Sequence, residues 1–151
     1  STLALELAQA GWSYLSDDEL LLSLVDGAVE ARGFRSFFAI SEAGAAFKRC
    51  FEPEIALGFT RVEQAFPRSL LFISLNGESR SQINRLTQTE TMTRLITACP
   101  WATYDRSVAS ANLRLLSALA RQANGFGLSA GRELLDPGFA ASFLSAALNP
   151  S

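Results

Sequence analysis

The sequence predicts a mainly α-helical, single domain over residues 1–151, with one short extended segment at about 55–66. Three observations predict this class. Ser16-Asp17-Asp18-Glu19 is a capping-box pattern followed by an apolar run. Apolar residues recur at helical spacing through residues 104–123. Hydrophobic residues make up 48% of the chain, which is enough for a core and excludes a disordered protein.

Two helices are expected in the first third of the chain. The capping box predicts a helix at about residues 17–32, which ends at Gly33. Ser41 is a suitable N-cap for a second helix. Pro53 would end that helix, because proline has no amide hydrogen and clashes with the preceding turn.

The next segment is ambiguous between helix and strand. Residues 55–66, "IALGFTRVEQAF", have the composition of a short strand or extended segment. Pro67 suits the first turn of a helix, which would carry the apolar residues of 68–76. The same run could be a strand that ends at the Asn76-Gly77 turn signal, so both alternatives stay open.

The second half of the chain contains the clearest helix. Residues 77–102 are rich in Thr, Ser, Asn and Gln, and predict a long loop with a helical turn at about 89–96. A helix is predicted at 104–123, followed by a turn at 124–127. Asp136-Pro137 predicts a last short helix.

The charges are unevenly distributed along the chain. Residues 1–79 carry six basic and eleven acidic side chains, a balance of −5. Residues 80–132 carry seven arginines against Glu90 and Asp105, a balance of +5. Because a planar guanidinium suits phosphate and carboxylate, this segment is the candidate binding region.

Arginines on one side of the helix at 104–123 define a candidate nucleic-acid face. Arg106, Arg114 and Arg121 fall opposite its apolar positions. They could be a solvated helix face, which usually mixes acids with bases at a spacing of four residues. The scarcity of acids favours a phosphate track instead. The other candidates for this track lie in the preceding loop and are Arg80, Arg85 and Arg94.

Several function classes find no support in the sequence. Histidine is absent, and no carboxylate pair, metal-ligand cluster or nucleophile motif is evident, so we expect no enzyme, cofactor or metal. Cys50 and Cys99 show no framework spacing and predict buried thiols in a reducing compartment. No apolar run reaches membrane-spanning length. The low share of charged residues, 19%, suggests that part of the surface packs against other copies.

A family resemblance is carried by five stretches in order along the chain. They are "WSYLS" (12–16), "AFKRCFEPE" (46–54), "GFTRVEQAFPRSLLFISLNGESRSQI" (58–83), "TETM" (89–92) and "YDRSVASANLRLLSALARQ" (104–122). In order and spacing, most of residues 12–148 resembles the coat proteins of rod-shaped plant viruses of the tobacco mosaic virus type. The resemblance implies a four-helix bundle that assembles with many copies of itself into a helical rod around single-stranded RNA. It also implies a location in the virion and the host-cell cytoplasm.

The resemblance assigns roles to particular residues. Arg80 stands where the family has its first phosphate-binding arginine, and Gln82 replaces the second. Asp105 and Ser107 match the start of the fourth helix, where the family places carboxylate and hydroxyl groups near the nucleotides. Arg106 lies beside them, and we assign it to RNA from the arginine face.

Glu52 and Glu54 lie near a family position for carboxylates that repel each other between subunits. The function predicted is therefore a structural capsid protein that packages single-stranded RNA. The alternative is a non-viral helical adaptor that binds protein and no nucleic acid.

Overall fold

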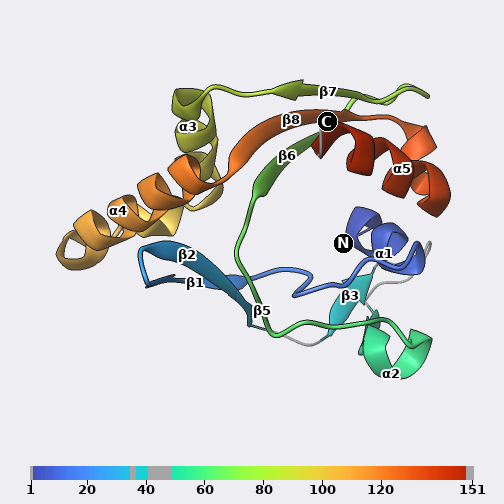
Figure 1. The fold of residues 1–151 in the computed structure, drawn as a ribbon, viewed down its shortest axis with the longest axis horizontal. Helices are drawn as coiled ribbons and strands as arrows, with labels where there is room; N and C mark the ends of the chain where they lie inside the picture. Colours follow the sequence, from blue (N-terminus) through green and yellow to red (C-terminus); the bar gives the residue numbers. More distant parts are fainter. Residues whose placement is uncertain (1, 35–36, 41–48, 149–151) are drawn as a thin grey trace. The chain divides into compact units, whose positions relative to one another are not determined.

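The computed structural model describes residues 2–34, 37–40 and 49–148, and these form a mixed α/β fold in two compact units. Unit 1 comprises the described parts of 1–21, 31–65 and 132–151, and unit 2 comprises Leu22–Glu30 and Phe66–Gly131. The mainly α-helical four-helix bundle is wrong, because strands in three sheets accompany the helices (Figure 1).

The helices in the described part of the chain are α1 (Thr2–Gln9), α2 (Pro53–Leu57), α3 (Gln88–Ala98), α4 (Arg106–Gln122) and α5 (Pro137–Leu148), with 3₁₀ turns η1 (Pro100–Thr103) and η2 (Arg132–Leu135). The strands are β1 (Leu20–Val25), β2 (Ala28–Gly33), β3 (Phe38–Ile40), β4 (Arg49–Phe51), β5 (Gln64–Ala65), β6 (Ser69–Leu75), β7 (Gln82–Arg85) and β8 (Asn124–Ala130).

The helix expected at 17–32 is instead the β1–β2 hairpin. Asp26 and Gly27 join the two strands with φ angles of 50° and 83°. Two successive residues with positive φ are typical of a type I′ hairpin turn, for which Asp-Gly is a preferred pair. The local cap signal at Ser16 was therefore overridden by a turn signal ten residues later.

The rest of the first half also departs from the expected helices. The segment 41–48 lies outside the described residues, and β4 replaces the end of the helix that was expected to stop at Pro53. Pro53 begins α2, and the chain turns at Gly58, whose φ is 68°. The strand expected at 55–66 is therefore confined to β5, which pairs with β2.

Unit 2 is built on a three-stranded sheet in the order β6-β8-β7. β6 confirms the strand alternative for residues 68–76, and it runs parallel to β8. The long loop expected at 77–102 is wrong, because β7 pairs antiparallel with β8, but the helical turn expected at 89–96 is confirmed as part of α3. Figure 1 shows β8 between its two neighbours, with α3 and α4 at the end of the sheet where β8 begins.

The turn expected at 124–127 is instead the start of the central strand. A Cβ at Gly125 would lie 1.9 Å from the Thr91 hydroxyl oxygen, and one at Gly127 would lie 3.0 Å from the Asn84 amide oxygen. Glycine is therefore required at position 125 because α3 approaches the backbone closely, and both glycines lie inside a strand.

The helix predicted at 104–123 is confirmed within two residues as α4. Its apolar side contributes Leu119 and Ala120 to the core of unit 2, where Leu95 of α3 and Val29 of β2 are also buried. Gln122 holds the hairpin in this core: it accepts a hydrogen bond from the Val29 amide at 2.6 Å and donates to the Val29 carbonyl at 2.9 Å.

The last predicted helix is confirmed in unit 1. Asp136 caps α5, since its carboxylate accepts a hydrogen bond from the Phe139 amide at 2.7 Å. The Phe139 and Phe143 rings stack with centroids 5.7 Å apart.

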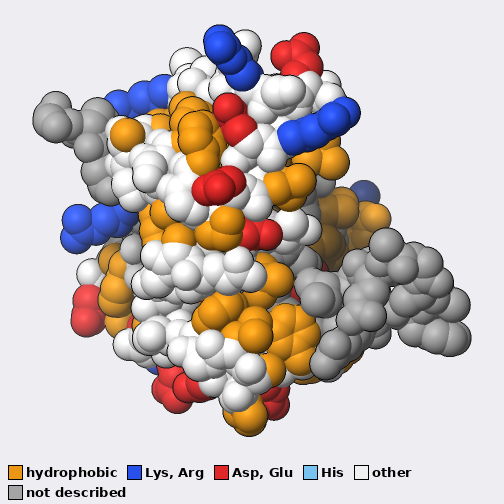
Figure 2. All heavy atoms as spheres, turned by 90° about the vertical axis from the view of Figure 1, so that its right-hand side faces the viewer, with side chains coloured by type: hydrophobic (Ala, Val, Ile, Leu, Met, Phe, Trp, Pro, Cys, Tyr) orange, Lys and Arg blue, Asp and Glu red, His pale blue; other side chains and the backbone are white. Residues whose placement is uncertain are grey.

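Apolar side chains are well represented on the surface. Figure 2 shows hydrophobic side chains interspersed with charged ones on the face it presents. The exposed large hydrophobic residues include Ile55, Leu75, Trp101 and Tyr104. Among the described helices, none has the length and apolar character needed to cross a membrane.

Candidate nucleic-acid interface

The start of α4 is held by the two residues that the resemblance assigned to RNA. The Asp105 carboxylate accepts hydrogen bonds from the Ser107 amide at 2.8 Å and from the Ser107 hydroxyl at 2.7 Å. These bonds, with the hydroxyl first, lower the pKa of Asp105 below its usual value. Asp105 is therefore the N-cap of α4 and holds the Ser107 hydroxyl, and an RNA contact by either side chain stays a prediction.

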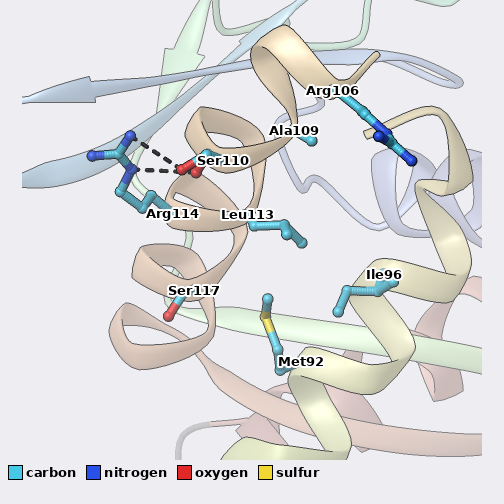
Figure 3. Close-up of a pocket in the computed structure, with 8 residues that line it drawn as sticks. All are labelled: Met92, Ile96, Arg106, Ala109, Ser110, Leu113, Arg114 and Ser117. Carbon is cyan, nitrogen blue, oxygen red and sulfur yellow. Dashed lines mark hydrogen bonds between the residues drawn. The ribbon is translucent and has the colours of Figure 1, made fainter. Parts of the chain in front are cut away.

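The three arginines of the predicted face of α4, Arg106, Arg114 and Arg121, are exposed, although Figure 3 shows that the Arg106 and Arg114 side chains extend to different sides of the helix. Arg114 donates to the carbonyl and hydroxyl oxygens of Ser110 at 3.2 and 3.3 Å, and Arg121 donates to the Ser117 hydroxyl at 2.6 Å. No described carboxylate lies within ion-pair distance of the three guanidiniums, so their charge is not neutralised inside the described chain.

An apolar groove of about 740 Å³ lies between α3 and α4. Met92 and Ile96 of α3 face Leu113 of α4 across it, as Figure 3 shows. Arg106 lies at the margin of the groove, and Arg114 extends to the other side of α4. The groove thus combines an apolar floor with the charged side chain of Arg106 at its margin.

Two exposed aromatic residues immediately precede the arginine face. Trp101 in η1 is 64% exposed, and Tyr104 is 80% exposed. η1 is attached to α4, because the Asn112 side-chain amide donates to the Ala102 carbonyl at 3.0 Å and Ala102 is buried. Neither residue was among the predicted site residues, although two aromatic side chains in "PWATY", just before a capped helix with arginines, could have indicated a base-stacking surface.

The remaining predicted arginines do not form one continuous track. Arg80 follows β6, and its carbonyl accepts from the Asn76 side chain at 2.9 Å. Arg85 lies at the other end of the sheet and donates to the Asn124 side chain at 2.6 Å. Arg80 and Arg85 therefore lie near opposite ends of β8, and a seven-residue strand spans about 23 Å.

Arg94 is on α3 and has two neighbours inside unit 2. Its guanidinium carbon lies 5.9 Å from the centroid of the Phe72 ring, which is cation–π distance. Its charge also contributes to the lowered pKa of Glu90, although the Thr87 hydrogen bonds contribute more. Arg94 is therefore partly engaged within the fold.

The carboxylates proposed for subunit contacts lie in unit 1. Glu52 precedes α2 and Glu54 is in its first turn, and both side chains are exposed. Nothing in a single chain tests whether they oppose carboxylates of another copy.

The expected burial of both thiols is wrong for Cys50, which is exposed, and Cys99 is half-buried. Burial raises the pKa of the Cys99 thiol. Among the described residues there is no group of three or more His, Cys, Asp or Glu side chains that could hold a metal ion.

The geometry therefore offers a cationic helix face with adjacent aromatic side chains and an apolar groove. A scan against protein-family models, a search of curated proteins and a search of solved structures each found no match.

Proposed function

We propose that unit 2 binds single-stranded RNA along α4 and the residues that precede it. The observation that carries this proposal is the exposed pair Trp101 and Tyr104 just before Arg106 in the chain, with Arg114 further along α4. The guanidiniums of both arginines have no described carboxylate partner. Guanidiniums contact the phosphates, and aromatic rings stack on unpaired bases. Such contacts position a strand without reading its sequence, so unrelated RNAs should bind with similar affinity.

The wider role that we propose is packaging of a viral RNA genome by many copies of the protein, in the virion and the host-cell cytoplasm. Two features support self-assembly: the 19% share of charged residues and the exposed apolar side chains. The four-helix bundle is no part of this proposal, because the fold is mixed α/β. Any rod would have to be built from different subunit contacts than a bundle provides.

The test of RNA binding compares two single arginine replacements. Arg106→Gln should weaken the binding of a short labelled RNA, measured by fluorescence anisotropy. It should also lower the slope of the logarithm of the affinity against the logarithm of the salt concentration by about 0.7. Arg132→Gln is the matched control, because Arg132 is also exposed but belongs to unit 1. Trp101→Leu should weaken binding at unchanged charge, since stacking contributes about 1–3 kcal/mol per base. Equal losses from Arg106→Gln and Arg132→Gln would show that only net charge matters, and no binding at low salt would overturn the proposal.

A second candidate function is docking of a protein segment, and the apolar groove between α3 and α4 favours it. A groove lined by Met92, Ile96 and Leu113 suits the apolar side of an amphipathic helix. Leu113→Gln removes apolar surface without changing the charge, so it should leave RNA affinity nearly unchanged. If RNA does not bind the wild-type protein at all, this adaptor function becomes the better proposal.

A further inference from the structure

A second hollow, of about 410 Å³, lies where β8 begins, at the opposite end of α4 from Arg106. Arg121 is fifteen positions after Arg106 in the helix, which corresponds to about 22 Å along the axis. Its lining comes from β7, α3, α4 and β8 and includes Arg85, Gln88, Thr91, Arg121, Asn124 and Gly125. All of them belong to unit 2.

Two guanidiniums line this hollow, and each is oriented by a neutral group. Arg85 donates to the Asn124 side-chain oxygen at 2.6 Å, and Arg121 donates to the Ser117 hydroxyl at 2.6 Å. A guanidinium has five N–H groups, so each retains donors for a ligand. Since neither contacts a carboxylate among the described residues, both keep an uncompensated charge.

The nearest acidic residue along α3 is already engaged elsewhere. The Glu90 carboxylate accepts hydrogen bonds from the Thr87 amide at 2.8 Å and the Thr87 hydroxyl at 2.7 Å. It is therefore held in the capping box of α3, and it does not line the hollow.

The wall of the hollow is shaped by the close approach of α3 to β8. Thr91 is 1% exposed and donates to the Thr87 carbonyl at 2.9 Å, and Gly125 lies directly against it without a side chain. Gln88, the first residue of α3, also lines the hollow, so the positive end of the helix dipole adds to the two arginines.

From this geometry we propose that the hollow is a phosphate-binding pocket, in which Arg85 and Arg121 grip one phosphate group from two sides. Guanidiniums bind phosphate oxygens through paired, charge-assisted hydrogen bonds. This role would explain why Arg85 and Arg121 are held by the neutral side chains of Asn124 and Ser117 and not by carboxylates. The phosphate could be the 5′-terminal group of an RNA, in which case the site rests on the proposed function. It could equally be a free phosphate or pyrophosphate ion, which requires no RNA binding.

The first arm of the test uses free anions and calorimetric titration of the intact protein. Wild-type protein should bind pyrophosphate more tightly than phosphate, and Arg85→Gln or Arg121→Gln should each weaken binding by about tenfold. Arg132→Gln is the matched control, because it removes one exposed arginine of unit 1, and it should leave the titration unchanged. Asn124→Asp should also weaken binding, because the new carboxylate pairs with Arg85 and repels the anion. Thermal unfolding of each variant identifies any replacement that disturbs the fold.

The second arm compares a 5′-phosphorylated RNA with the same RNA carrying a 5′-hydroxyl. A gain in affinity from the phosphate that disappears in Arg85→Gln/Arg121→Gln identifies the RNA terminus as the ligand. Pyrophosphate binding without any RNA binding supports the pocket while rejecting the proposed RNA function. The pocket is rejected if the double variant binds pyrophosphate and 5′-phosphorylated RNA as wild type does, or if wild type binds neither phosphate source.

Discussion

At the residue scale, the packing of α3 against β8 depends on Gly125. It lies in β8, and Thr91 of α3 occupies the space that any side chain would need. Thr91 itself is buried and bonded to the Thr87 carbonyl, so it has little freedom to move away. The helix and the strand can approach this closely only because residue 125 has no Cβ.

We predict that Gly125→Ala destabilises the protein by about 1–3 kcal/mol, the usual cost of overpacking a core. Urea unfolding followed by circular dichroism measures the effect. Gly127→Ala is the control, because its Cβ would meet only the end of the exposed Asn84 side chain at 3.0 Å and should cost less. Adding Thr91→Ala to Gly125→Ala should restore part of the loss. Equal stability of the two single glycine variants would contradict the packing argument.

At the scale of elements, two helices of unit 2 begin with carboxylates that accept cap hydrogen bonds, so the stability of these helices depends on pH in the acid range. Thr87 and Glu90 form a reciprocal capping box on α3, and Asp105 caps α4. Hydrogen bonds from the Thr87 amide, then from its hydroxyl, lower the pKa of Glu90 below its ordinary value of 4.5. The unfolded chain therefore takes up this proton at higher pH than the native protein does.

We predict that the cap contribution is fully present above about pH 4.5 and is lost as pH falls through the lower native pKa of Glu90. Glu90→Gln should retain a capping side chain but lose this titration. Its free energy of unfolding should match the wild type near neutral pH and decline less steeply in acid. Urea unfolding across the acid range tests this, and parallel curves for the two proteins would contradict it. Asp105→Asn should have the same effect at α4, where the Ser107 bonds lower the pKa in the same direction.

At the scale of the whole molecule, the surface has few charges for its apolar content. Charged residues make up 19% of the chain, the net charge is −2, and the isoelectric point is about 5.2. Exposed apolar side chains occur in both units, for example Ile55 in unit 1 and Leu75 in unit 2. Repulsion between copies is therefore weak near neutral pH and disappears near the isoelectric point.

We predict that RNA-free protein self-associates, and that association strengthens as pH falls from about 8 toward the isoelectric point, where net repulsion vanishes. Sedimentation velocity measures the distribution of assemblies, and negative-stain microscopy shows whether they are rods. Glu52→Gln/Glu54→Gln should shift the alkaline distribution toward the acid one if these carboxylates oppose each other between copies. A monomer at every pH, or stronger association at the alkaline end, would contradict the prediction.

The sequence by itself determined the features that depend on neighbours within one or two helical turns. α4 and α5 begin at the caps Asp105 and Asp136, since a cap bond joins residues two or three positions apart. The exposure of Arg106, Arg114 and Arg121 also agrees with the helical spacing, which places them opposite the apolar positions of α4. The β1–β2 hairpin was also readable from the sequence, because Asp26-Gly27 is a local turn signal that the predicted helix at 17–32 left out of account.

Only the tertiary structure decided which distant residues meet. β6 pairs in parallel with β8, although a strand and two helices lie between them in the sequence. Because of that pairing, the residues expected to form a glycine turn are part of the central strand instead. Arg85 and Asn124 are 39 residues apart, yet they share a hydrogen bond in the proposed phosphate pocket. No local pattern encodes such contacts, because strand pairing and burial depend on the balance of packing over the whole unit.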